Sequence, residues 1–176
     1  MTPLLDDFAS EYARYRALGE RALEQMPDSA LNHVPSPEGN SAAMLVRHVS
    51  GNFASRFTDF LTTDGEKPWR GRDEEFAERT YSRVEVNALW AKAFEVLSKA
   101  LAELTDADLA RTVTIRGQPL TVHAALCRSL AHMSYHVGQL VLLARERADS
   151  PWKSLSIPRG ESAAYNAAPT HERGPR

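Results

Sequence analysis

Apolar residues recur at intervals of three and four along four long stretches of the chain. This is the spacing of helices that bury one face. The stretches cover about residues 3–26, 41–61, 82–104 and 122–147. Four amphipathic helices with little strand signal predict an all-α fold, and specifically a four-helix bundle.

Polar residues suited to helix capping stand in front of each stretch. Ser82 is followed by Glu85 at the spacing of a capping box. The other predicted caps are Thr2 before Pro3, Asn40 or Ser41, and Thr121.

The connections between the stretches are unequal in length. The second connection, "TTDGEKPWRGRDEEF", is longer than most in a bundle, and such linkers are often functional or mobile. The segment "RTVTIRGQPLTV" alternates polar and apolar residues around Gly117, which predicts either a short β-hairpin before the last helix or an extended segment. After Ser150 we expect an irregular C-terminal tail.

Length and charge narrow the class of protein. The 176 residues suit one domain, which we place at residues 1–166, with a disordered tail at 167–176. A net charge of −2 with interspersed signs gives no footprint for nucleic acid or a membrane surface. The single Cys127 and the lack of a signal-peptide pattern predict a cytoplasmic protein.

Two histidines lie one turn apart in the last predicted helix. His132 and His136 flank its core-facing stripe, and imidazoles four residues apart can converge on one metal ion. Gln139, on the same side, could donate a hydrogen bond to this pair. Alternatively, the two rings are packed aromatics with satisfied nitrogens.

A third histidine, His48, borders the buried face of the second predicted helix. It shares a polar strip with Asn52, Ser55 and Asp59, and Arg56 lies beside it. Such a strip suits a solvated pocket.

Three histidines without a fourth protein ligand would leave coordination positions open, as catalytic sites do. A histidine-rich set suits zinc, nickel, iron or copper better than magnesium or calcium.

The blocks "HVSGNFASRFTDFLTTDGEKPWRGRDEEF", "HMSYHVGQL" and "WKSLSIPRGES" together resemble a branch of unassigned function in the DinB/YfiT-like superfamily of four-helix-bundle metalloproteins. The similarity covers roughly residues 1–166. It implies a divalent metal, zinc or nickel first and then iron, held by His48, His132 and His136. It also implies a homodimer and a small-molecule substrate such as a low-molecular-weight thiol.

Three hypotheses for function follow. The first is a metal-dependent hydrolase or thiol S-transferase in which Arg56, Asn52 or Asp59 orients the substrate. The second is a non-catalytic metal-binding bundle, and the third is a plain helical dimerisation module.

In the long linker, Arg70 and Arg72 could form an anion-binding rim, but we expect Trp69 to fill the bundle end and the charges to solvate the loop.

Overall fold

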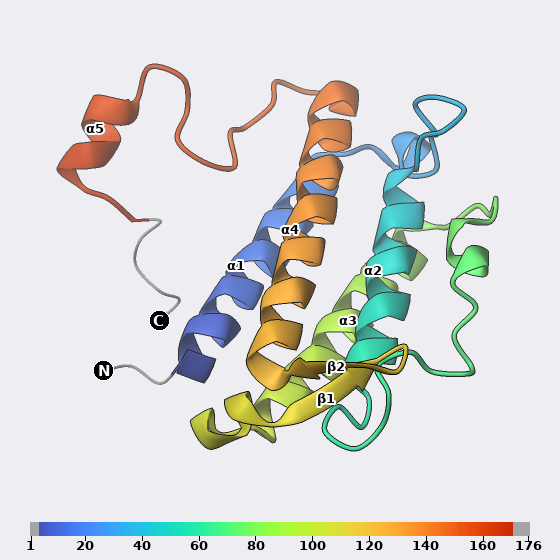
Figure 1. The fold of residues 1–176 in the computed structure, drawn as a ribbon. Coiled ribbons are helices and arrows are strands. Elements are labelled where there is room, and N and C mark those ends of the chain that lie inside the picture. Colours follow the sequence, from blue (N-terminus) through green and yellow to red (C-terminus); the bar gives the residue numbers. More distant parts are fainter. Residues whose placement is uncertain (1–3, 171–176) are drawn as a thin grey trace.

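The computed structural model describes residues 4–170, and its four long helices pack side by side as predicted (Figure 1). They are α1 Leu4–Glu24, α2 Ala42–Phe57, α3 Arg83–Ala102 and α4 Val122–Arg147. Each of α1 and α2 lies against both α3 and α4. The bundle therefore brings α2 and α4 together, although they are far apart in the sequence.

Three of the predicted caps are confirmed. The Ser41 hydroxyl accepts a hydrogen bond from the Met44 amide, and the Thr121 hydroxyl accepts one from the Ala124 amide. Ser82 and Glu85 form the reciprocal capping box at the start of α3. The predicted Thr2 cap and Pro3 lie outside the described residues.

The predicted end of the second helix is wrong by four residues. Helix α2 stops at Phe57, Thr58 is extended, and Asp59 adopts a left-handed conformation with φ 50°. Phe60 nevertheless packs on Phe57, with ring centroids 5.3 Å apart. The apolar spacing continues through the turn for this reason, so spacing alone placed the end too late.

A short β-hairpin precedes α4, which settles the alternative in favour of the hairpin. Strands β1 Thr112–Ile115 and β2 Gln118–Thr121 pair antiparallel. Arg116 and Gly117 both have positive φ, 55° and 71°, as a two-residue type I′ turn requires.

The connection from α2 to α3 is held to this hairpin and to α2. The Asp64 carboxylate accepts hydrogen bonds from the amides of Arg116 and Gly117, each at 2.8 Å. The Ser55 hydroxyl donates to the Gly65 carbonyl at 2.7 Å. The connection also forms a 3₁₀ turn, η2 (Asp73–Phe76). Contrary to expectation, Trp69 does not fill the bundle end, since it is 58% exposed.

The remaining elements are short. They are the 3₁₀ turns η1 Asp28–Ala30 and η3 Asp106–Ala110 and the helix α5 Ser162–Ala167. Helix α5 lies apart from the bundle, so the tail is not wholly irregular (Figure 1). The tail is attached to α1, where the Arg21 guanidinium donates to the Leu155 carbonyl at 3.0 Å. The predicted disorder at 167–176 falls partly on residues 171–176, which lie outside the described part.

None of the helices within residues 4–170 is sufficiently long and apolar to span a membrane.

Candidate metal centre

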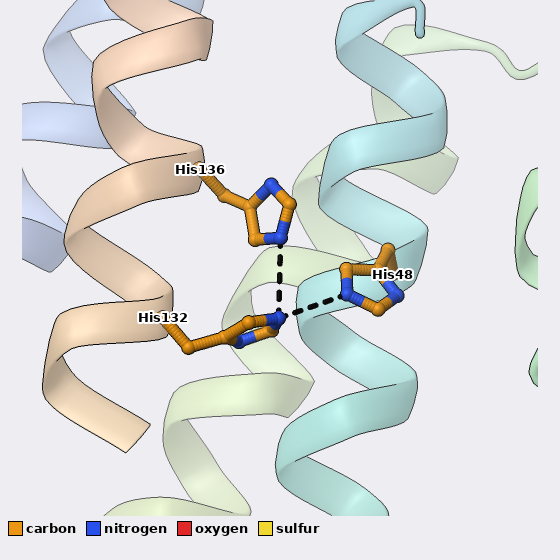
Figure 2. Close-up of side chains that lie close together, drawn as sticks. All are labelled: His48, His132 and His136. Atoms are coloured by element: carbon orange, nitrogen blue, oxygen red, sulfur yellow. Dashed lines mark hydrogen bonds between the residues drawn. The ribbon is translucent and has the colours of Figure 1, made fainter. Parts of the chain in front are cut away.

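Helices α2 and α4 direct three histidine rings toward one point (Figure 2). His48 comes from α2, and His132 and His136 come from successive turns of α4. The Nε2 atom of His132 lies 3.1 Å from that of His48 and 3.2 Å from that of His136. The structure thus brings together the three predicted ligands.

The spacing of the three nitrogens suits a transition-metal ion. Bonds of about 2.0–2.1 Å place two nitrogen ligands about 2.9 Å apart at a right angle and about 3.3 Å apart at a tetrahedral angle. The two Nε2 separations fall between these limits. The cluster is therefore compatible with a divalent metal ion.

Outer hydrogen bonds place a proton on Nδ1 of two of the rings. The Nδ1 of His48 lies 2.7 Å from Oε2 of Glu75, and the Nδ1 of His136 lies 2.8 Å from Oε1 of Gln139. Both oxygens accept, so each Nδ1 donates, and in the neutral form of either ring the Nε2 presents a lone pair. Gln139 lies where predicted, but it accepts a hydrogen bond where we expected a donor.

The two short nitrogen contacts cannot both be hydrogen bonds between neutral rings. His132 has at most one proton on Nε2, and that atom faces a lone pair from His48 and another from His136. At least one contact then joins two lone pairs. A cation between the three nitrogens would remove this repulsion, so the donor set itself fits a metal ion.

Additional protons on His132 and His136 are disfavoured. Burial, together with the charges of His136 and His48, lowers the pKa of His132 to about 3. Burial also lowers the pKa of His136. Both rings are therefore neutral at physiological pH, the form that binds a metal.

Glu75 is the buried carboxylate behind His48. Arg70 donates to both of its oxygens, from Nε at 2.8 Å and from Nη2 at 3.0 Å. Burial raises the pKa of Glu75, but hydrogen bonds from His48 and Arg70 outweigh burial and hold that pKa below its usual value. Glu75 is thus an anion that orients His48, the outer partner typical of metal-bound histidines.

Gly51 provides the space for this carboxylate. A Cβ atom built on Gly51 would lie 2.2 Å from Oε1 of Glu75. Because real Cβ atoms do not approach so closely, α2 can hold His48 and admit Glu75 only if residue 51 lacks a side chain.

A cavity of about 270 Å³ opens beside the histidines. His48 and His132 form part of its wall, as do Asn52 and Arg56, two of the three residues expected to contact substrate. Asp59, the third, is exposed beyond the end of α2 and does not line the cavity. The structure therefore does not bring it to the histidine site.

Sequence reasoning missed Glu75 as a site residue. It lies in a linker rich in acids, "GRDEEF", where periodicity gives no means of choosing among them. The available signal was indirect: Gly51 within a helix, three residues after His48, leaves room for a side chain from outside that helix. Arg70 was noticed as a rim candidate but is buried against Glu75.

Comparisons with known proteins agree with this architecture. The structure is similar to a DinB-like protein, YjoA, from Bacillus subtilis, with a TM-score of 0.65, 20% identity, and coverage of 84% of this chain and 96% of that one. It is also similar to a DinB-like protein from Bacillus cereus ATCC 10987, with a TM-score of 0.64, 19% identity, and coverage of 84% and 95%. A search of curated proteins found no match.

At the level of families, residues 1–161 match the family described as Protein of unknown function (DUF1572). That match covers most of the chain, and the two solved structures have the same fold as this chain. The chain therefore belongs to the DUF1572 family and has the fold of the DinB-like proteins.

Proposed function

We propose that this protein is a metal-dependent enzyme, a hydrolase or a thiol-dependent transferase, whose divalent metal is held by His48, His132 and His136. One observation carries the proposal: three Nε2 atoms converge while Glu75 and Gln139 fix two of them as acceptors. Three rings that were packed without a metal would not direct the lone pairs of His48 and His136 at the Nε2 atom of His132.

The arrangement favours catalysis over a purely structural metal. Three protein ligands leave coordination positions open, and the adjoining cavity reaches two of the ligands, His48 and His132. A metal held there would supply Lewis-acid activation and lower the pKa of a water or thiol that reaches it. The nitrogen donors favour zinc or nickel, and then iron.

The chain's own residues would bind and orient the substrate. Asn52 and Arg56 line the cavity on the α2 side. The Arg56 guanidinium is held by the Glu66 carboxylate, with both Nη atoms 3.1 Å from Oε2. We expect Asn52 to bind a polar group of a small substrate, such as a low-molecular-weight thiol. We expect the protein to act in the cytoplasm.

A non-catalytic metal-binding homodimer is the second candidate. Tyr135 and Leu142 lie seven residues apart on α4 and are 64% and 54% exposed, which favours a partner on this helix face. Sedimentation velocity of wild type and Tyr135→Glu tests the assembly. A dimer that becomes monomeric in the variant supports this interface, and a monomeric wild type contradicts it.

Cobalt substitution tests the proposed chemistry. The protein is stripped of metal, loaded with Co²⁺, and titrated with cysteine as a probe thiol. An open position predicts a thiolate-to-cobalt charge-transfer band in wild type and none in His132→Ala. A cobalt spectrum that cysteine leaves unchanged would indicate a closed site and favour the non-catalytic candidate.

A further inference from the structure

The wall of the cavity beside the histidines is rich in arginine. Among residues 4–170, five arginines line it, and no aspartate or glutamate does. They come from α2, the long connection, the hairpin turn and α4, and they are Arg56, Arg70, Arg72, Arg116 and Arg128. Five separate positions thus supply positive charge to one small concave space in a chain whose net charge is −2.

Nearby carboxylates compensate only part of this charge. Oε2 of Glu66 lies 3.1 Å from Arg56, 3.0 Å from Arg116 and 3.7 Å from Arg70. One carboxylate oxygen is therefore shared among three guanidinium groups. Glu75 contributes a second negative charge, which is already used by Arg70 and His48.

The other two arginines, Arg72 and Arg128, are less engaged in ion pairs. Arg128, on α4, forms no ion pair with any residue between 4 and 170. Arg72 lies 3.8 Å from the exposed Asp73 and stacks over Phe76, with its guanidinium carbon 5.3 Å from the ring centroid. Stacking fixes the plane of a guanidinium and leaves its N–H groups free to bind an anion.

We propose that this cavity binds a small molecule bearing an oxyanion, a carboxylate or a phosphate, and that Arg72 and Arg128 are its principal anion contacts. The planar guanidinium donates two parallel hydrogen bonds to either group. The inference rests on the proposed function, because it names the substrate class of the same site.

The rest of the wall limits the body of this ligand. Phe57, Phe60 and Ile115 give the cavity an apolar side, while Asn52 and Thr114 add polar groups. A volume of about 270 Å³ lies just below the range typical of drug-sized ligands, so it suits a metabolite-sized molecule. The cavity encloses its arginines on a concave wall, which suits a compact anion and not an extended polyanion.

Calorimetric titration with two probes, inorganic phosphate and succinate, tests the proposal at low ionic strength. Metal-free and zinc-loaded forms of the protein are compared. Each of Arg72→Gln and Arg128→Gln is expected to weaken binding of the preferred probe by about tenfold. Arg128→Lys should fall between wild type and Arg128→Gln, because it keeps the charge but loses the paired donors.

Arg145→Gln is the matched control, since Arg145 is also exposed on α4 but does not line the cavity. Circular dichroism of each variant confirms that it is folded. A weakening equal to that in Arg145→Gln, or no binding of either probe to wild type, would overturn the inference. Succinate-only binding assigns a carboxylate, and phosphate-only binding assigns a phosphate.

The two proposals fail separately in this design. Arginine-dependent binding in a protein that takes up no zinc would support the anion site and contradict the metal site. The opposite outcome is a protein that takes up zinc and binds the anion in a way that needs His48 and His132 but is unaffected by Arg72→Gln and Arg128→Gln. That result would retain the metal site and overturn the role given to Arg72 and Arg128.

Discussion

The carboxylate of Glu75 accepts a hydrogen bond from Nδ1 of His48 at 2.7 Å, although the two residues come from different segments, the α2–α3 connection and α2. Their side chains are only 7% and 5% exposed. This contact fixes which nitrogen of His48 faces the other two rings. The long connection therefore does more than join two helices, because it orients the ring of a candidate ligand.

Glu75→Gln should weaken metal binding by about 10- to 100-fold, the effect usual for an outer partner of a metal-bound histidine. The neutral amide accepts a weaker hydrogen bond from His48 and removes the ion pair between Arg70 and residue 75. Arg70 then keeps its longer contact with Glu66, at 3.7 Å. Competition with a chromophoric chelator measures the affinity. Glu74→Gln, at an exposed neighbouring position, is the control, and equal affinities in the two variants would argue against this role for Glu75.

Gly51→Ala and Gly138→Ala should change stability in opposite directions. An exposed helical glycine replaced by alanine gains roughly 0.5–1 kcal/mol, which we expect at Gly138, where an added Cβ meets open space. At Gly51 the added Cβ would displace the Glu75 carboxylate, so we expect destabilisation. Urea unfolding of the metal-free proteins measures both, and stabilisation by Gly51→Ala would contradict the close approach.

The metal-free protein should lose stability as pH falls from 6.5 to 4.5. An unfolded histidine takes up a proton near pH 6.5, but the folded pKa of His132 is about 3, lowered mainly by burial. The unfolded state therefore binds more protons over this interval, and stability falls with pH. Unfolding in urea at several pH values measures the trend, which should be shallower in His132→Asn; an equally steep trend would refute this assignment.

Asp106→Ala should destabilise the protein by about 1 kcal/mol, as loss of a helix cap does. Its carboxylate accepts hydrogen bonds from the amides of Leu4 and Leu5, at 3.0 and 3.1 Å, and so caps α1 from a distant part of the chain. Thermal unfolding measures the effect. The control is Asp149→Ala at an exposed position, and equal melting temperatures for the two variants would rule out the cap.

The helices and the histidines could be predicted because their signals are local. Apolar spacing and the capping residues Ser82 and Thr121 located α3 and α4, and the four-residue spacing of His132 and His136 placed both rings on one face. His48 joined them as a third candidate because it borders the buried face of its own helix, and the resemblance implied the same three ligands. The end of α2 was missed because Phe60 keeps the apolar spacing beyond the last helical residue.

The parts that could not be predicted depend on contacts between distant segments. Glu75 reaches His48 only because the connection folds back over α2, and no local pattern separates it from Glu74. Likewise, Asp64 holds the hairpin turn from more than fifty residues away. Of the polar strip predicted on the second helix, Asn52 lines the cavity and Asp59 does not, because α2 ends between them.

Metal content is the most direct test of the three-histidine site. Elemental analysis of purified wild type should find close to one zinc, nickel or iron per chain, and His132→Ala/His136→Ala should retain almost none. His123→Ala is the matched control, because His123 is exposed on the same helix and outside the cluster. Near-stoichiometric metal that persists in the double variant, or a wild type that binds none after incubation with these ions, would contradict the account.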